Sequence, residues 1–98
     1  MLVAKLELNK SGKNSRTRPV ILAGREWRPQ FYTSDPERST SFLIRSLRGG
    51  PQLAPGESGI VEGELLQPEL FPELKAGDQF CVREGSKEVG HGTILEMD

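Results

Sequence analysis

The chain has 98 residues, of which 35% are hydrophobic and 28% charged, and its formal net charge is −1. These values are typical of a soluble globular domain and exclude a disordered or membrane-embedded chain. Lys5 and Glu7 interrupt the apolar run that a signal peptide would need, and no stretch approaches the ~20 apolar residues of a membrane helix. We therefore expect one cytoplasmic domain over residues 1–98.

Alternation of apolar and polar residues predicts strands along most of the chain. The first is VAKLELN at residues 3–9, and the second is WRPQFY at 27–32. STSFLIRSL at 39–47 and GIVEGELL at 59–66 follow. Because side chains alternate across a strand, Pro29 and Phe31 of the second segment should face the core. Its outer face should then carry Arg28, Gln30 and Tyr32.

The last predicted element is a hairpin. DQFCVRE at 78–84 and KEVGHGTILEM at 87–97 flank Gly85–Ser86, a pair typical of two-residue type II′ turns. The best helical candidate, residues 66–77, contains Pro68 and Pro72, either of which would break a helix. Short strands and many turns favour an all-β fold, either a small closed antiparallel barrel or a sandwich.

No segment carries the pattern of a catalytic or cofactor site. GKNS at 12–15 is similar to the end of a phosphate-binding loop, but that motif requires Gly where this chain has Glu7. Cys81 and His91 are too few for a structural zinc site. We interpret Cys81 as a buried strand thiol and His91 as a strand residue flanked by glycines. The domain is therefore expected to be no enzyme and to bind no metal, nucleotide or other cofactor.

Charge is unevenly distributed along the chain. Residues 1–50 contain ten Lys/Arg and four Asp/Glu, whereas residues 51–98 contain three and ten. Such asymmetry can mark a surface that binds a polyanion. It can also be dispersed where strands from both halves interleave, and we favour dispersal.

Three motifs, in order, carry a resemblance to a known family. WRPQFYTSD at 27–35, PGE at 55–57 and FCVREGSKEVGHG at 80–92 resemble runs in the C-terminal, third domain of translation elongation factor Tu. The corresponding family runs read YRPQFYFRTTD and FAIREGGRTVGAG. The agreement in order and spacing covers nearly the whole chain and implies a six-stranded antiparallel closed barrel. The 98 residues contain neither that factor's GTPase domain nor its second barrel.

The resemblance also implies a function. In that family this domain contributes to binding the T arm of aminoacyl-tRNA, and it also contacts the GTPase domain and the exchange factor. Gln30 and Glu84, with Gly85 beside it, match family positions that contact the T stem. A further family contact, a Thr, would fall at Glu37, Ser39 or Thr40. Gln can bind 2′-hydroxyls and base edges in the shallow minor groove of RNA. The basic side chains of Arg83 and Lys87, beside the hairpin tip, can bind phosphates. The candidate RNA-binding residues are Arg28, Gln30, Arg83, Glu84, Gly85 and Lys87.

The alternative hypothesis is a protein-interaction or regulatory module that imitates this domain and binds partners of the translation machinery without RNA. Replacement of the family's aromatic residues before RPQFY, and Glu88 beside the hairpin, favour it. The RNA hypothesis predicts one exposed positive face that contains Arg28, Gln30, Arg83 and Lys87. The alternative predicts an exposed apolar patch. Its candidate residues are Trp27, Leu70 and Phe71.

Overall fold

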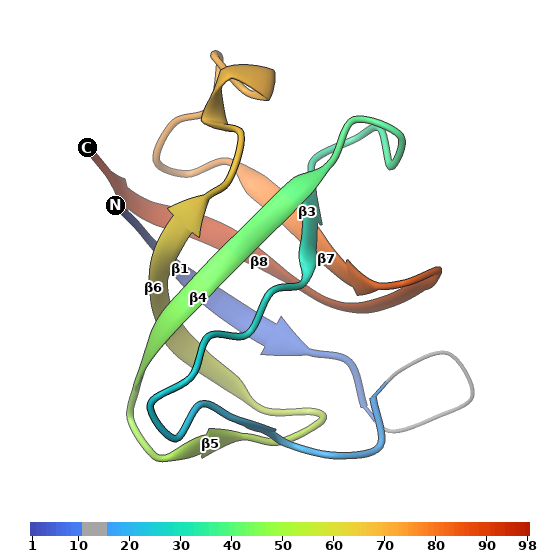
Figure 1. Ribbon diagram of the computed structural model, residues 1–98, viewed down its shortest axis with the longest axis vertical. Helices are drawn as coiled ribbons and strands as arrows, with labels where there is room; N and C mark the ends of the chain where they lie inside the picture. The colour runs from blue at the N-terminus through green and yellow to red at the C-terminus, as the bar shows by residue number, and fades with distance from the viewer. Residues whose placement is uncertain (11–15) are drawn as a thin grey trace.

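Six strands close into an antiparallel barrel in the computed structural model, which describes residues 1–10 and 16–98 (Figure 1). This confirms the predicted all-β barrel and excludes the sandwich. Two further short strands, β2 (Val20–Ile21) and β5 (Gln52–Leu53), pair with each other. Around the barrel the order is β1 (Leu2–Leu8), β6 (Ser58–Leu65), β4 (Thr40–Arg48), β3 (Gln30–Tyr32), β7 (Gln79–Glu84) and β8 (Lys87–Met97), which pairs with β1. The GKNS segment at 12–15 lies outside the described residues.

The predicted alternation is confirmed in β1. Ala4, Leu6 and Leu8 are buried in the barrel, whereas Lys5 and Glu7 are exposed. This is the pattern of an antiparallel strand with one face on the core and the other in water. β1 lies between β6 and β8, so its backbone hydrogen bonds close the barrel.

β3 is shorter than the segment predicted at 27–32. Only Gln30, Phe31 and Tyr32 form a strand, and an isolated bridge joins Trp27 to Ile44. The reason is Pro29, which has no N–H to donate to the ladder. Its carbonyl still accepts a hydrogen bond from the Phe42 N–H at 2.8 Å. The predicted facing is confirmed nevertheless, because Pro29 and Phe31 are buried while Arg28, Gln30 and Tyr32 are not.

All four phenylalanines of the chain meet in the core. The Phe31 ring stacks on Phe80 with centroids 4.9 Å apart, and it makes edge contacts with Phe42 at 5.9 Å and Phe71 at 5.1 Å. Each such ring pair contributes about 0.5–1.5 kcal/mol beyond the burial of its area. Phe31 therefore ties the short strand β3 to both of its neighbours and to the segment between β6 and β7.

The interrupted helix and the hairpin are found where the sequence predicts them. Residues 66–77 contain only one 3-10 turn, η1 (Pro68–Leu70). At the hairpin, Glu84 pairs with Lys87, and Gly85 has φ +62° whereas Ser86 has no positive φ, as a type II′ turn requires. Among the described residues, no helix is long and apolar enough to cross a membrane.

The two oppositely charged halves of the sequence neutralise each other along the barrel wall. β4, from the basic half, lies beside β6, from the acidic half. Among the described residues, four Arg–Glu ion pairs join the two halves. Arg45–Glu64 and Arg48–Glu62 connect β4 to β6, whereas Arg16–Glu84 lies beside the hairpin and Arg38–Glu73 lies near η1. The favoured dispersal of charge is thus found along the wall.

Barrel closure predicts a large cost for a methyl group at Gly63. An added Cβ would collide with the backbone carbonyl oxygen of Leu43 and lie 3.0 Å from the Ile44 Cα. Because β4 cannot move away without breaking its ladder with β6, Gly63→Ala should lower the free energy of unfolding by about 1–3 kcal/mol, as overpacked cores do. Urea denaturation measures this loss.

Gly59→Ala on the same strand is the matched control. Its added Cβ would lie closest to the methyl groups of Leu53 and Leu47, at 3.3 and 3.4 Å, which can rotate, and 3.8 Å from the Arg48 carbonyl oxygen, an ordinary van der Waals distance. We expect a change below about 1 kcal/mol for this variant. Equal losses for the two variants would contradict the close backbone approach at Gly63.

Candidate nucleic-acid interface

Gln30 and Arg83 lie directly opposite each other on β3 and β7. On the other side of β3, Gln30 faces Ser41 of β4. The Gln30 side-chain N–H donates to the Ser41 hydroxyl at 3.1 Å, and the Ser39 hydroxyl donates to the Gln30 carbonyl at 3.4 Å. The two serines therefore hold the Gln30 amide in a fixed orientation on the outer wall of the barrel.

The Arg83 guanidinium joins the hairpin to the loop between β3 and β4. It donates to the Pro36 carbonyl and the Ser39 hydroxyl, each at 3.1 Å, and to the Gly85 carbonyl at 3.2 Å. Its carbon lies 5.8 Å from the centre of the Tyr32 ring. Arg83 is half-buried, and its Nε has no partner among the described residues. Arg83 thus fixes the shape of this surface.

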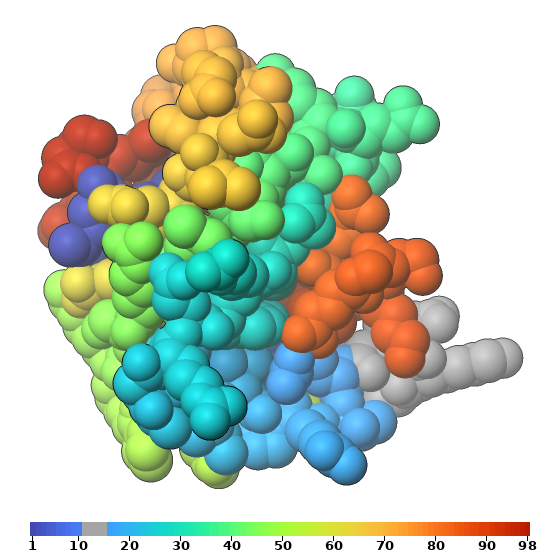
Figure 2. Space-filling view, in the orientation of Figure 1, coloured from blue at the N-terminus to red at the C-terminus, as the bar shows by residue number. Residues whose placement is uncertain are grey.

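Glu84 connects the hairpin to the segment that precedes β3. Its carboxylate accepts a hydrogen bond from the Trp27 indole N–H at 2.9 Å and forms an ion pair with Arg16. The Arg16 guanidinium also lies 5.6 Å from the centre of the Trp27 ring. Figure 2 shows the corresponding contact between residues 16–32, in blue to cyan, and the orange hairpin on one face. Sequence reasoning missed Arg16, for which the only signal was the basic character of its segment.

Arg28 lies apart from Gln30 and Arg83. It forms an ion pair with Glu26 at 2.7 Å, and Glu26 is also bound by Arg45 at 2.8 Å. The hydrogen bonds from Arg45 and then Arg28 lower the pKa of the Glu26 carboxyl below its usual value. Arg45 in turn contacts Glu64, so these four charges form one network over the barrel wall.

Gly85 and Lys87 are exposed at the tip of the hairpin. Arg18 and Arg25 are exposed on the segment before β3, and sequence reasoning did not single them out. The basic side chains of Arg18, Arg25 and Lys87 have no ion-pair partner among the described residues. The predicted continuous positive face is not formed, because Arg28 is paired with Glu26 and Arg83 is half-buried. Three acidic side chains also lie among the basic ones, and they belong to Glu26, Glu84 and Glu88.

The three apolar candidates do not form an exposed patch. Phe71 is 3% exposed because its ring packs against Phe31. Trp27 and Leu70 are half-buried and pack on the core. The prediction of an apolar surface at these residues is therefore wrong for Phe71. The exposed large apolar side chains of the described residues are instead Met1, Ile21, Leu66, Leu95 and Met97.

The two ends of the barrel differ in charge. We define the hairpin end as residues 9–10, 16–28, 48–57 and 84–88, and the termini end as residues 1, 33–41, 63–79 and 94–98 (Figure 1). The hairpin end carries seven Lys/Arg and four Asp/Glu, whereas the termini end carries two and eight. Dispersal of charge along the wall thus leaves a basic end and an acidic end.

Tyr32, Cys81, His91 and Glu7 form a row across β3, β7, β8 and β1. Burial raises the pKa of the Cys81 thiol to about 11, and the Glu88 carboxylate adds to the rise. The thiol is therefore protonated near neutral pH and is a poor nucleophile. Cys81 was expected to be buried and is half-buried. The described residues contain no group of three or more His, Cys, Asp or Glu placed to hold a metal.

A comparison with known protein families found none whose model matches this chain.

The Tyr32–Glu88 contact predicts an unusual tyrosine titration. Burial and the Glu88 carboxylate, which accepts the Tyr32 hydroxyl at 3.1 Å, raise the pKa of Tyr32 from 10.0 to about 12. Between these values the unfolded chain loses a proton that the folded chain keeps, so stability should fall as pH rises. Tyr32 is the only tyrosine, so tyrosinate absorbance measures its pKa directly.

Glu88→Gln is the control, because it keeps an acceptor but removes the charge. Its titration midpoint should lie below that of the unaltered domain. A midpoint near 10 in the unaltered domain, with the circular dichroism of the folded state retained, would contradict the contact.

The Glu84 contacts predict a change in the fluorescence of Trp27, the only tryptophan. Glu84→Ala removes the acceptor of the indole N–H, so water should reach the indole and shift its emission to longer wavelength. Because the Glu84 side chain is 36% exposed, we expect the free energy of unfolding to fall by only about 1 kcal/mol. Glu84→Gln keeps an acceptor and should change both quantities less. Unchanged emission in Glu84→Ala would show that Glu84 does not hold Trp27.

Proposed function

We propose that the domain is a non-enzymatic binding module that contacts structured RNA weakly, with tRNA as the best candidate. The observation that carries this proposal is the fixed pair of Gln30 and Arg83 on the outer wall, next to the basic hairpin end. Gln30 would bind the RNA minor groove, and exposed basic side chains of the hairpin end would bind phosphates.

Gln30 retains hydrogen-bonding capacity that suits a ribose. Its amide group has two N–H donors and two acceptor lone pairs, and one of each is used by Ser41 and Ser39. One donor and one acceptor therefore remain. A 2′-hydroxyl both donates and accepts, and it is the group that distinguishes RNA from DNA in the wide, shallow minor groove. Because the serines fix the amide, little side-chain entropy would be lost on binding.

The phosphate contacts would come from Arg18, Arg25 and Lys87. All three are exposed, and no acidic side chain of the described residues forms an ion pair with them. Neutralising a phosphate releases condensed counterions, which makes binding favourable at low salt. Because few basic side chains are unpaired and the net charge of the chain is −1, the affinity of the domain for RNA should be modest.

The motifs shared with elongation factor Tu support the same proposal. In that resemblance Gln30, Glu84 and Gly85 would contact the T stem. The contacts in the described structure divide these roles differently, because the Glu84 carboxylate is already bound to Trp27 and Arg16. We therefore assign Glu84 to holding the surface in shape and Gln30 to direct contact with RNA. Arg28 contributes less, since it is paired with Glu26.

The phosphate contacts predict a change in the salt dependence of tRNA binding. Labelled tRNA is titrated with the domain at several salt concentrations, and the slope of log affinity against log salt is measured. Arg18→Ala, Arg25→Ala and Lys87→Ala should each reduce this slope by about 0.7–0.9, the value for one lost phosphate contact. Lys5→Ala, on the exposed face of β1, is the matched control and should leave the slope unchanged.

Gln30→Ala should weaken tRNA binding by about tenfold and leave the salt slope unchanged, because it removes a hydrogen bond and no charge. Gln79→Ala, an exposed glutamine at the start of β7, is its control. No binding even at low salt would overturn the proposed function. Equal effects of the Gln30 and Gln79 variants would overturn the role of Gln30.

A further inference from the structure

Four side chains on the outer wall form one continuous series of hydrogen bonds. The Arg83 guanidinium donates to the Ser39 hydroxyl at 3.1 Å, and that hydroxyl donates to the Gln30 carbonyl oxygen at 3.4 Å. The Gln30 amide nitrogen then donates to the Ser41 hydroxyl at 3.1 Å. The series crosses β7, β3 and β4, which lie side by side in the wall (Figure 1). We call these four residues the Gln30 network.

The positive charge of Arg83 sets the direction of the network. A guanidinium has only N–H donors, so the Ser39 oxygen accepts from it and the Ser39 hydrogen remains free to donate. Hydrogen bonds in series polarise one another, and an oxygen that accepts from a cation becomes a weaker acceptor while its own O–H becomes a stronger donor. The Gln30 side chain therefore turns its carbonyl toward Ser39, and its NH₂ group toward Ser41.

The loop that carries Ser39 is held on two sides. Arg83 also donates to the Pro36 carbonyl at 3.1 Å, which attaches the loop between β3 and β4 to the hairpin. In the same loop, Arg38 forms an ion pair with Glu73 at 2.8 Å, which attaches it to the segment after η1. The Ser39 hydroxyl thus has a fixed place beside Gln30.

The orientation of the Gln30 amide matters because its oxygen and nitrogen have nearly the same shape. In an unrestrained glutamine, rotation of the amide by about 180° exchanges the two atoms freely. The exchanged form would present a donor where the network presents an acceptor. With the orientation fixed, one lone pair and one N–H of Gln30 point to defined places. A 2′-hydroxyl can satisfy both, because it donates and accepts.

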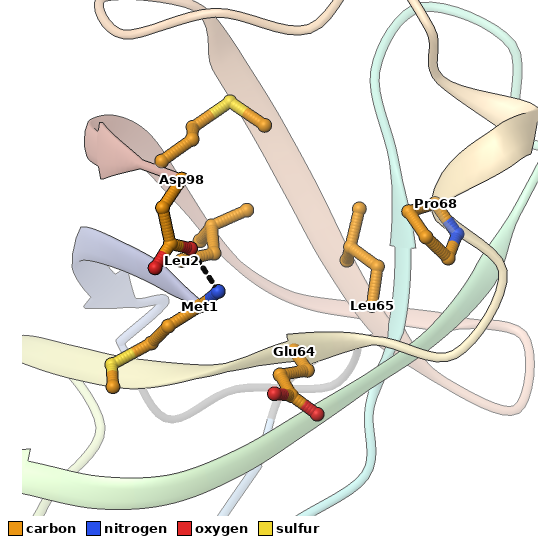
Figure 3. A pocket seen from close by; sticks show the side chains of 7 residues that line it. Met1, Leu2, Glu64, Leu65, Pro68 and Asp98 are labelled. Atoms are coloured by element: carbon orange, nitrogen blue, oxygen red, sulfur yellow. Dashed lines mark hydrogen bonds and ion pairs between the residues drawn. The ribbon is translucent and has the colours of Figure 1, made fainter.

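The hollow at the termini end differs from this wall in that its charged groups are already paired. It has a volume of about 290 Å³, and Glu64 and Asp98 are the acids that line it. Figure 3 shows the Met1 amine bound to Asp98, and Glu64 forms an ion pair with Arg45 at 3.2 Å. A polar ligand would gain less there than at Gln30, where one donor and one acceptor are unused.

We propose that Arg83 and Ser39 are positioning residues that make the Gln30 contact selective for a nucleic acid with 2′-hydroxyl groups. Both act through the orientation of the Gln30 amide, and neither needs to contact RNA. Arg83 is thereby assigned to orientation and not to a phosphate. The selectivity rests on the proposed function, whereas the control of the amide orientation can be measured without RNA.

The first experiment uses the free domain. NMR measures the rate at which the Gln30 side-chain NH₂ protons exchange with water. Ser39→Ala removes the donor to the carbonyl, so the amide should rotate away from Ser41 and exchange about fivefold faster. Ser39→Thr keeps a hydroxyl and should restore the slow rate. Ser58→Ala, an exposed serine at the start of β6, is the matched control. An unchanged rate in Ser39→Ala would overturn the proposal.

The second experiment compares two forms of one labelled RNA hairpin. One has ordinary riboses, and in the other fluorine replaces each 2′-hydroxyl of the stem, which keeps the A-form geometry but removes the donor. The unaltered domain should bind the ribose form about tenfold more tightly, as expected for one hydrogen bond. Ser39→Ala and Arg83→Lys should each lower this ratio about fivefold, because only part of the population then presents the correct orientation. Ser39→Thr should retain the ratio.

The salt dependence of binding separates positioning from direct contact. Arg83→Gln should leave the slope of log affinity against log salt unchanged, whereas loss of a phosphate contact would reduce it by about 0.7–0.9. A reduced slope would overturn the positioning role of Arg83. A ratio unchanged in Ser39→Ala would overturn the selectivity and leave the proposed function standing. Absence of binding to both hairpins would overturn the proposed function and the selectivity together, and the exchange rates alone would then decide the control of the amide orientation.

Discussion

The buried Phe31 ring holds the short strand β3 in the barrel wall. β3 has only three residues, and Pro29 removes one of the hydrogen bonds that a longer strand would make. The Phe31 ring compensates by contacting Phe42 of β4, Phe80 of β7 and Phe71 after η1. Because neighbouring residues on a strand face opposite sides, burial of Phe31 places Gln30 on the outer wall opposite Arg83. The core thus determines the polar surface that we propose binds RNA.

Barrel closure also separates the charges of the chain. β6 of the acidic half lies between β1 and β4 of the basic half, and Arg45 and Arg48 of β4 form ion pairs with Glu64 and Glu62 of β6. At the ends, the connecting segments set the balance instead. Residues 16–28 contribute arginines to the hairpin end, and residues 63–79 contribute Glu and Asp side chains to the termini end. A domain with a small net charge can therefore attract an anionic partner at one end and a cationic partner at the other.

Much of the fold could be predicted from the sequence because its signals are local. Alternation in β1, the Gly85–Ser86 turn and the proline-interrupted helix each depend on a few neighbouring residues. The limits of β3 could be foreseen only in part, since tertiary contacts decide whether residues beside Pro29 remain in the ladder. The candidate site was harder to predict. Glu84 pairs with Arg16 across 68 positions of sequence, and no local pattern indicates such a contact.

Placement of Phe71 and of the exposed apolar residues shows the same limit. As sequence, LFPEL at 70–74 is as apolar as a docking surface, and only the position of Phe31 shows that Phe71 belongs to the core. Met1 and Met97 lie near opposite ends of the sequence, and the ladder between β1 and β8, in which Leu2 pairs with Met97, brings them to one end of the barrel. Charge polarity likewise follows from which connections lie at which end.

We propose that the wall at Gln30 and Arg83, with the hairpin end, contacts structured RNA. Titration of the isotope-labelled domain with tRNA, followed by backbone amide NMR spectra, maps this surface residue by residue. Progressive shifts are expected for the amide signals of Gln30, Arg83, residues 84–87 and residues 16–28, with residues 64–70 and 95–98 unchanged. Spectra that do not change with excess tRNA at low salt, or shifts confined to the termini end, would overturn the proposed surface.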